Sequence, residues 1–255
     1  MSTHPLTPQI DIRTAGTRFA TRTGWLDSRH SFSFSHHWDP HNTHHGLLLV
    51  NNDDTVAPGT GFETHPHRDM EIVTWVLSGS LVHQDSKGNH GVIYPGLAQR
   101  MSAGTGIYHS EKNDSWRGFG GEEHDTPVHF VQMWVVPDQR GVEPGYEQAE
   151  IGDEQLRGVL VPVASGMSQH SGEPAIRIRQ HQAALHAARL DPGQAVVVPD
   201  APYVHLFVAR GTADLEAAGV LGAGDAVRLT ATGGRRLEAL EPAEVLVWEM
   251  HAALD

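Results

Sequence analysis

Cysteine is absent from the 255 residues of this chain. Its absence excludes disulfide frameworks, thiolate nucleophiles, and zinc or iron–sulfur sites held by cysteine. No apolar run approaches the roughly 18 residues of a membrane-spanning helix, so no such helix is predicted. The first residues lack a basic segment followed by an apolar one, so no secretory signal is predicted. From these absences we expect a cytoplasmic protein.

Basic residues are scarce as well. Lys and Arg number 18 against 31 Asp and Glu, which gives a formal net charge of −13 with histidine neutral. Such a chain repels phosphate backbones and anionic lipids, so we expect neither non-specific nucleic-acid binding nor membrane binding. Histidine, in contrast, occurs 19 times. Because histidine is the commonest metal ligand, the sequence raises the question of whether some of these side chains converge.

Short apolar runs separated by turns of Gly, Pro, Asn and Asp recur along the chain, which is typical of an all-β sandwich or barrel. We predict strands at residues 46–51, 71–85, 91–94, 99–102, 128–136, 195–198, 203–209, 214–217, 226–229 and 245–250. Residues 150–157 fit a short helix, and residues 183–190 are ambiguous because their composition is helical but the run is short.

The two halves of the chain resemble each other. Residues 72–79 (IVTWVLSG) match residues 204–211 (VHLFVARG), and residues 95–101 match residues 223–229. We therefore predict two similar β-barrels of the jelly-roll type in tandem. The boundary should fall in the polar segment 137–152, which gives an N-terminal domain of residues 1–145 and a C-terminal domain of residues 146–255.

Two short patterns in the first half carry candidate metal ligands. His65 and His67 flank Pro66, and His109 and Glu111 flank Ser110. Side chains two residues apart on a strand share one face, so each pair can hold one ion. If the two strands are neighbours, three imidazoles and one carboxylate converge. That set suits a divalent transition metal such as Fe(II), and Mn, Ni, Cu and Zn are alternatives.

These patterns also carry a family resemblance. The motif from Gly59 through His65 and His67 to Glu71 resembles the first cupin motif. The segment 101–111 (MSAGTGIYHSE), together with residues 65–71 (HPHRDME) and residues 83–88 (HQDSKG), is similar to the pirin family. Residues 24–28 and 31–34 resemble the beginning of bacterial pirin-like proteins. The resemblance covers most of residues 20–147.

The resemblance implies a bicupin whose N-terminal barrel holds one iron ion through His65, His67, His109 and Glu111. In many other cupins the ligand is the glutamate at the position of Glu71, so the choice between the two glutamates stays open. We favour Glu111 as the ligand, with Glu71 orienting the N–H of a ligating imidazole. In the repeat, the four ligands map to about Val197, Pro199, Leu237 and Ala239. The second barrel is therefore expected to be degenerate and metal-free.

Three further segments bear on the site. Gln132 is a candidate for the wall of a pocket above the metal. Residues 116–125, rich in Gly and acidic side chains, are predicted to be a loop bordering the entrance. The five histidines between residues 36 and 45 are predicted to lie on a solvated loop.

The resemblance implies an iron-dependent dioxygenase that opens the ring of flavonols such as quercetin, with dioxygen as the second substrate. Glu111 or Glu71 would accept the proton of the metal-bound hydroxyl. The alternative is a metal-dependent redox-sensing protein that regulates a protein partner. With either function we expect a monomer. A third interpretation is a different small phenol or hydroxy acid as substrate. Because cupins host many chemistries, the fold alone does not choose among these.

Overall fold

The computed structural model describes residues 5–115, 123–173 and 175–254. Most of the predicted loop at residues 116–125 lies outside these ranges. The described chain is nearly all β, with one four-residue helix, α1 (Asp153–Leu156), and two 3-10 turns, η1 (Ala15–Thr17) and η3 (Ser168–His170). Among the described residues, no helix has the length and apolarity needed to cross a membrane. The predicted all-β class is confirmed.

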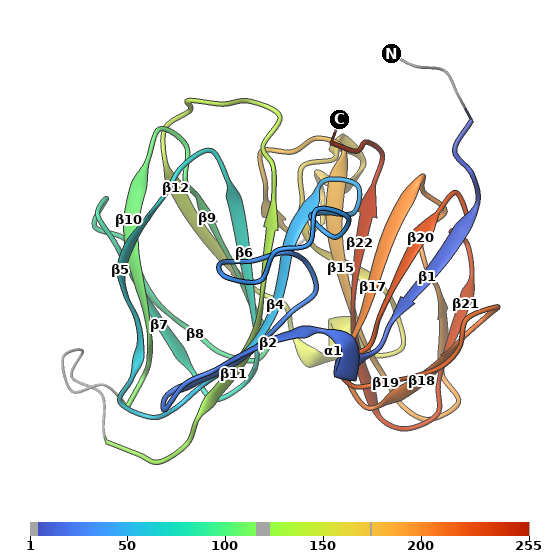
Figure 1. Cartoon of the computed structure of the whole chain (residues 1–255), viewed down its shortest axis with the longest axis horizontal. Helices are drawn as coiled ribbons and strands as arrows, with labels where there is room; N and C mark the ends of the chain where they lie inside the picture. Colours follow the sequence, from blue (N-terminus) through green and yellow to red (C-terminus); the bar gives the residue numbers. More distant parts are fainter. Residues whose placement is uncertain (1–4, 116–122, 174, 255) are drawn as a thin grey trace.

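The first half folds into two antiparallel sheets that pack as a sandwich (Figure 1). Its large sheet has the order β12 (Gly145–Glu150), β9 (Leu97–Ser102), β6 (Glu71–Ser78), β11 (Val128–Val135), β4 (Leu48–Val56), β3 (Leu26–His30) and β2 (Phe19–Arg22). Its small sheet has the order β5 (Gly61–His67), β10 (Ile107–Asn113), β7 (Leu81–Asp85) and β8 (His90–Ile93).

The second half has the same two-sheet arrangement, with one parallel pair of strands at the edge of its large sheet. Its large sheet has the order β1 (Gln9–Arg13), β20 (Ala226–Thr230), β17 (Tyr203–Arg210), β22 (Ala243–Met250), β15 (Ala183–Leu190), β13 (Val161–Ser165) and β14 (Ile176–Arg177). Its small sheet has the order β16 (Ala195–Val197), β21 (Arg236–Ala239), β18 (Thr212–Leu215) and β19 (Gly219–Gly222). The ambiguous run 183–190 is thus a strand, and two similar β units stand in tandem as predicted.

A pair of glycines shows how closely the halves correspond. Gly79 and Gly211 end equivalent strands with φ angles of 72° and 73°. A Cβ atom would lie 2.6 Å from the Pro127 carbonyl oxygen at the first position and 2.0 Å from that of Pro242 at the second. Both positions therefore need glycine for the left-handed backbone and for the close approach of a second chain segment.

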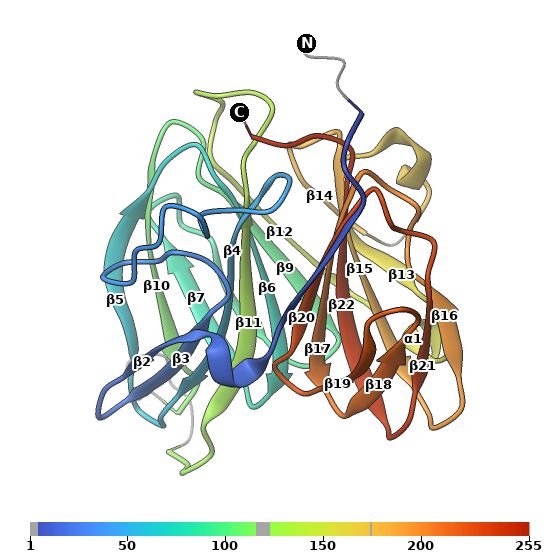
Figure 2. The same cartoon turned by 45° about the vertical axis from the view of Figure 1, so that its right-hand side comes forward.

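The edge strands cross the predicted domain boundary. β12 pairs with β9 and extends the large sheet of the first half. The N-terminal strand β1 pairs with β20 and takes the equivalent place in the second half, as Figure 2 shows. β12 and β1 are therefore the corresponding edge strands of the two large sheets. The domain division at residues 145/146 remains a prediction.

The two large sheets pack against each other. Alternate residues of β6 (Val73, Trp75 and Leu77) share one buried cluster with Phe207 and Trp248 of the second half. The Trp75 indole Nε1 donates to Glu244 Oε1 across this contact at 2.7 Å. β6 is buried along almost its whole length because its other face covers the interior of the first sandwich.

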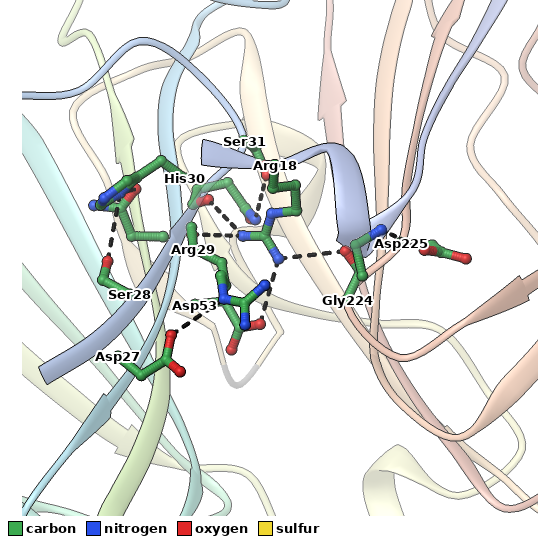
Figure 3. A network of polar contacts seen from close by, with 12 residues as sticks. Arg18, Asp27, Ser28, Arg29, His30, Ser31, Asp53, Gly224 and Asp225 are labelled. Carbon is green, nitrogen blue, oxygen red and sulfur yellow. Dashed lines mark hydrogen bonds and ion pairs between the residues drawn. The ribbon is translucent and has the colours of Figure 1, made fainter. Parts of the chain in front are cut away.

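A buried arginine adds a polar link between the halves (Figure 3). The Arg18 guanidinium donates to the backbone oxygens of Arg29 at 2.7 Å and Asn51 at 3.2 Å, both in the first half, and to that of Gly224 in the second half at 3.3 Å. It also pairs with Asp53 at 3.3 Å. Ordered contacts of this kind hold the two sandwiches in one arrangement.

Candidate metal centre and its pocket

Three histidines meet on the small sheet of the first half. β5 and β10 are antiparallel neighbours, and the register places His65 opposite His109. The Nε2 atoms of these two rings lie 3.1 Å apart, and the ring centroids of His67 and His109 are 4.9 Å apart. One ligand atom from each of the three rings lies within 4.8 Å of the others, close enough to share an ion.

The register between β5 and β10 slips beside this cluster. His109 pairs with His65, but Glu111 pairs with Phe62, so β5 carries one extra residue there. Such a β-bulge re-aims side chains and is common next to functional sites. On its other side β10 stays in register with β7, which places His83 opposite Glu111.

Two of the three rings, those of His67 and His109, are electrically neutral near pH 7. Burial, together with repulsion from the neighbouring imidazoles, lowers the pKa of His67 to about 4. The same two causes lower the pKa of His109 to about 2. A neutral imidazole keeps a lone pair on one nitrogen, which is the form that binds a metal ion.

Hydrogen bonds at the far side of two rings select the nitrogen that faces the cluster. The Glu63 carbonyl accepts from His65 Nδ1 at 2.7 Å, which leaves His65 Nε2 with its lone pair. His109 Nδ1 lies 3.4 Å from His83 Nδ1, and His83 Nε2 lies 3.4 Å from Asp85 Oδ2. If His109 Nδ1 donates to His83 and His83 Nε2 donates to Asp85, the lone pair of His109 stays on Nε2. Metal-ligating histidines usually donate their other ring nitrogen to a neighbouring group in this way. Sequence reasoning missed His83 because only the β7–β10 register brings it here.

Glu111 is buried beside this cluster. The Gln132 amide nitrogen donates to both of its carboxylate oxygens, at 3.0 and 2.8 Å. Gln132 in turn accepts from the Trp134 indole nitrogen at 3.1 Å. Glu111 forms a group of possible ligand atoms with His83 and His109, whereas His65 and His67 belong to the group described above. His109 is common to both groups.

The structure does not bring Glu71 to the histidines. Glu71 lies on the face of β6 that carries Val73 and Trp75, toward the second half of the molecule. Its carboxylate accepts from the Ser102 hydroxyl at 2.8 Å and from the Arg179 backbone nitrogen at 3.0 Å. Burial raises the pKa of Glu71. Side-chain alternation along β6 directs this residue to the contact between the halves and away from the interior.

A pocket of about 790 Å³ opens beside the cluster. Its lining includes His65, His67, Glu111 and Gln132, together with four aromatic side chains, Trp25, Phe34, Phe62 and Trp134. This volume lies within the range of roughly 300–1,000 Å³ that holds small ligands. His36 also lines the pocket, whereas His45 is buried and its Nε2 lies 3.3 Å from the Leu229 carbonyl oxygen, so the predicted solvated loop is wrong for His45.

A polar row crosses the large sheet on the interior side of the first sandwich. Asn52, Gln132, Thr74 and Gln99 lie opposite one another on β4, β11, β6 and β9. All four are buried, and Thr74 Oγ1 and Gln99 Oε1 have no hydrogen-bond partner among the described residues. Asp54 extends the row on β4, where burial raises its pKa to about 7. Its Oδ1 has no hydrogen-bond partner in the part of the chain that the structure describes. Groups of this kind are kept buried where a ligand or ordered water satisfies them.

Comparisons with known proteins agree with this architecture. The family model "Pirin" matches residues 12–135, and the model "Quercetinase C-terminal cupin domain" matches residues 163–250. A Mycobacterium tuberculosis protein named "Putative quercetin 2,3-dioxygenase" is 59% identical over 249 residues, covering 98% of each chain. The chain belongs to the pirin family.

Two further relatives come from Escherichia coli. The protein named quercetin 2,3-dioxygenase in strain K12 is 38% identical over 187 residues, covering 73% of this chain and 75% of its own. The crystal structure of the bacterial pirin YhhW in complex with nickel(II) has a TM-score of 0.84 and 31% identity, covering 96% of this chain and 100% of the other. The predicted family and the tandem cupin fold are thereby confirmed.

The donor set of this pirin family member fits a divalent metal ion. His67 Nε2 is buried and has no hydrogen-bond partner within the described structure. An orphaned imidazole nitrogen beside two other imidazole rings is costly unless a ligand satisfies it. Nitrogen and carboxylate donors together suit Fe, Mn, Ni, Cu and Zn, so the donors agree with a metal without choosing one.

The second half lacks this donor set at the matching positions. The sheet register makes Leu237 the counterpart of Glu111, because Leu237 pairs with Leu215 as Glu111 pairs with His83. The same register makes Arg235 the counterpart of His109. The sequence repeat indicates Leu237 instead, which is two residues later. Leu237 belongs to the apolar core of the second sandwich.

Proposed function

We propose that this chain is a metal-dependent dioxygenase that opens the ring of flavonols such as quercetin. The observation that carries the proposal is the convergence of three imidazoles, two of which, His65 and His67, line a pocket with aromatic sides. The names of the relatives favour the same activity. A planar, hydroxylated aromatic molecule matches both the aromatic walls and the polar side chains of Asn52, Asp54 and Gln132 that line the pocket.

The proposed ligands are His65, His67, His109 and Glu111, and the proposed metal is Fe(II). When bound, the metal supplies Lewis acidity that lowers the pKa of a substrate hydroxyl. The hydrogen bond of His65 to the Glu63 carbonyl would fix that ring for binding. His83 would orient His109 in the same way, although it touches no substrate.

Glu111 is the proposed proton acceptor. Its carboxylate lines the pocket and would take the proton of the flavonol 3-hydroxyl. Gln132 holds both carboxylate oxygens, and Trp134 holds Gln132, so the acceptor has a fixed orientation. The flavonolate then reacts with dioxygen, both oxygen atoms enter the opened product, and carbon monoxide leaves. Glu71 has no part in this scheme because its carboxylate is bound at the contact between the halves.

The test is an aerobic assay of the Fe(II)-loaded protein with quercetin. We expect loss of flavonol absorbance, consumption of dioxygen and release of carbon monoxide in equal amounts. Glu111→Gln should lower turnover by about 10²–10⁴-fold, the usual contribution of a positioned base, while Glu71→Gln retains it.

Absence of turnover with any flavonol at full iron occupancy would contradict the proposal. That result would favour the regulatory alternative, in which the oxidation state of the metal alters contact with a protein partner. Turnover of another phenol or hydroxy acid, but of no flavonol, would keep the metal chemistry and overturn the proposed substrate.

A further inference from the structure

A second group of metal-ligating side chains lies in the second half of the molecule. His170, His186 and Glu249 each offer a ligand atom, and these atoms lie within 4.8 Å of one another. His186 and Glu249 are buried on the adjacent strands β15 and β22, and His170 ends the turn η3. We propose that His170, His186 and Glu249 form a second divalent-cation site, with zinc as the ion that it takes.

The donors are already gathered around the Glu249 carboxylate. His186 Nε2 lies 2.9 Å from Glu249 Oε2, and His251 Nε2 lies 2.8 Å from Glu249 Oε1. Three imidazoles and one carboxylate therefore surround this point, the same donor types as in the first half. Zinc binds nitrogen and carboxylate ligands in a tetrahedral shell, which a cluster of this composition can supply.

The buried ion pair of His186 and Glu249 does not account for the position of His170 beside it. His186 and Glu249 satisfy each other without it. The His170 ring nevertheless stands at 89° to the His186 ring, with 5.4 Å between centroids. Its Nδ1 lies 2.9 Å from the Ser165 hydroxyl, which leaves Nε2 as the ligand atom. Fixing the far nitrogen in this way is the common arrangement behind a ligating histidine.

The cluster is not a remnant of the site in the first half. Gln132 lies opposite Thr74 of β6, and Val247 lies opposite Leu206 of β17. Because Thr74 and Leu206 are equivalent positions, Val247 is the counterpart of Gln132. By the same register, His186 corresponds to Asn52 and Glu249 to Trp134. The second cluster therefore uses the large sheet, at positions that line the pocket in the first half.

An ion at this point would link segments that are far apart in the chain. It would hold η3 and the C-terminal end of β22 to β15. Zinc bound at His186 Nε2 would replace the hydrogen bond between this nitrogen and Glu249 Oε2. An ion that binds only the folded chain also raises the stability of the protein by mass action.

The experiment uses zinc as the probe in the full-length variant His65→Ala/His67→Ala, which disables the first site. Equilibrium dialysis should give one zinc ion per chain, and zinc should raise the melting temperature. Adding His170→Ala should weaken zinc binding by at least about tenfold, since even the supporting residues of zinc ligands are worth about 10–100-fold. The exposed His41→Ala is the matched control and should leave binding unchanged.

No stoichiometric zinc in the His65→Ala/His67→Ala protein would overturn the proposal. Equal affinity in the His170→Ala and His41→Ala proteins would also overturn it, because His186 and Glu249 would then be an ion pair only. If the His65→Ala/His67→Ala protein does not fold, zinc binding is measured without these substitutions. The wild-type chain should then bind two zinc ions, and the His170→Ala chain should bind one. Because the first site is disabled, failure here leaves the proposed function untouched.

Discussion

The two halves of this chain share one fold but fill their interiors differently. In the second half, the interior forms one apolar cluster of 18 buried residues. In the first half it divides into clusters of eight and four residues, separated by the polar row of Asn52, Gln132, Thr74 and Gln99. The counterparts of this row in the second half are His186, Val247, Leu206 and Val227. A few matched positions thus separate a filled core from a pocket beside three clustered histidines.

The largest expected effect comes from His67→Ala. The substitution removes the proposed ligand whose Nε2 has no partner within the described protein, so the proposed site should lose iron and the protein should lose flavonol turnover. The second sandwich should remain folded, because its core does not include residues of β5. Metal analysis together with the quercetin assay checks both effects. Stoichiometric iron and normal turnover in this variant would show that the ligand assignment is wrong.

Asp54→Asn tests the stability cost of the polar interior. Asp54 stays protonated in the folded state up to about pH 7, whereas it ionises near 3.8 when unfolded. The unfolded state therefore binds fewer protons between these values, and stability falls as the pH rises through them. At about 1.4 kcal/mol per pH unit, the loss is roughly 4 kcal/mol, and it is absent in the variant.

Urea unfolding from pH 4 to pH 8 measures this difference. The pH slope should flatten in Asp54→Asn and persist in Asp27→Asn, whose side chain is 48% exposed. No comparable slope arises at the matched position of the second half, where Ala188 belongs to the apolar core. Parallel pH profiles for wild type and Asp54→Asn would refute this account of the buried carboxyl group.

His83→Phe tests the support behind His109. Phenylalanine keeps a ring against Tyr146, which stacks on His83 with 4.9 Å between centroids, but it removes the partner of His109 Nδ1. We expect metal affinity to fall by about 10–100-fold, the usual effect of losing such a partner. Competitive metal titration measures it, with the exposed His90→Ala as control. Unchanged affinity would mean that His83 only packs.

The smallest effect is expected for Glu71→Gln. Glutamine keeps an acceptor oxygen for Ser102 and for the Arg179 backbone nitrogen, so stability should change by less than about 1 kcal/mol. Metal content and turnover should be those of the wild type. Thermal unfolding and the quercetin assay test this together, and loss of metal would return Glu71 to the list of ligands.

The sequence predicts this architecture well where the signal is local. Alternation along a strand predicts that His65 and His67 share a face, and the matched glycines predict the repeat. Other features depend on sheet register, which one sequence does not encode locally. The approach of His83 to His109, the direction of Glu71 toward the second half, and the meeting of His170 with Glu249 all depend on which strands become neighbours.

Anomalous X-ray diffraction from crystals of the iron-loaded chain, recorded at the iron absorption edge, tests the central claim most directly. The account predicts one strong peak within bonding distance of ring nitrogens of His65, His67 and His109, with a Glu111 oxygen beside it. A fully loaded protein without a peak at these three rings would contradict it.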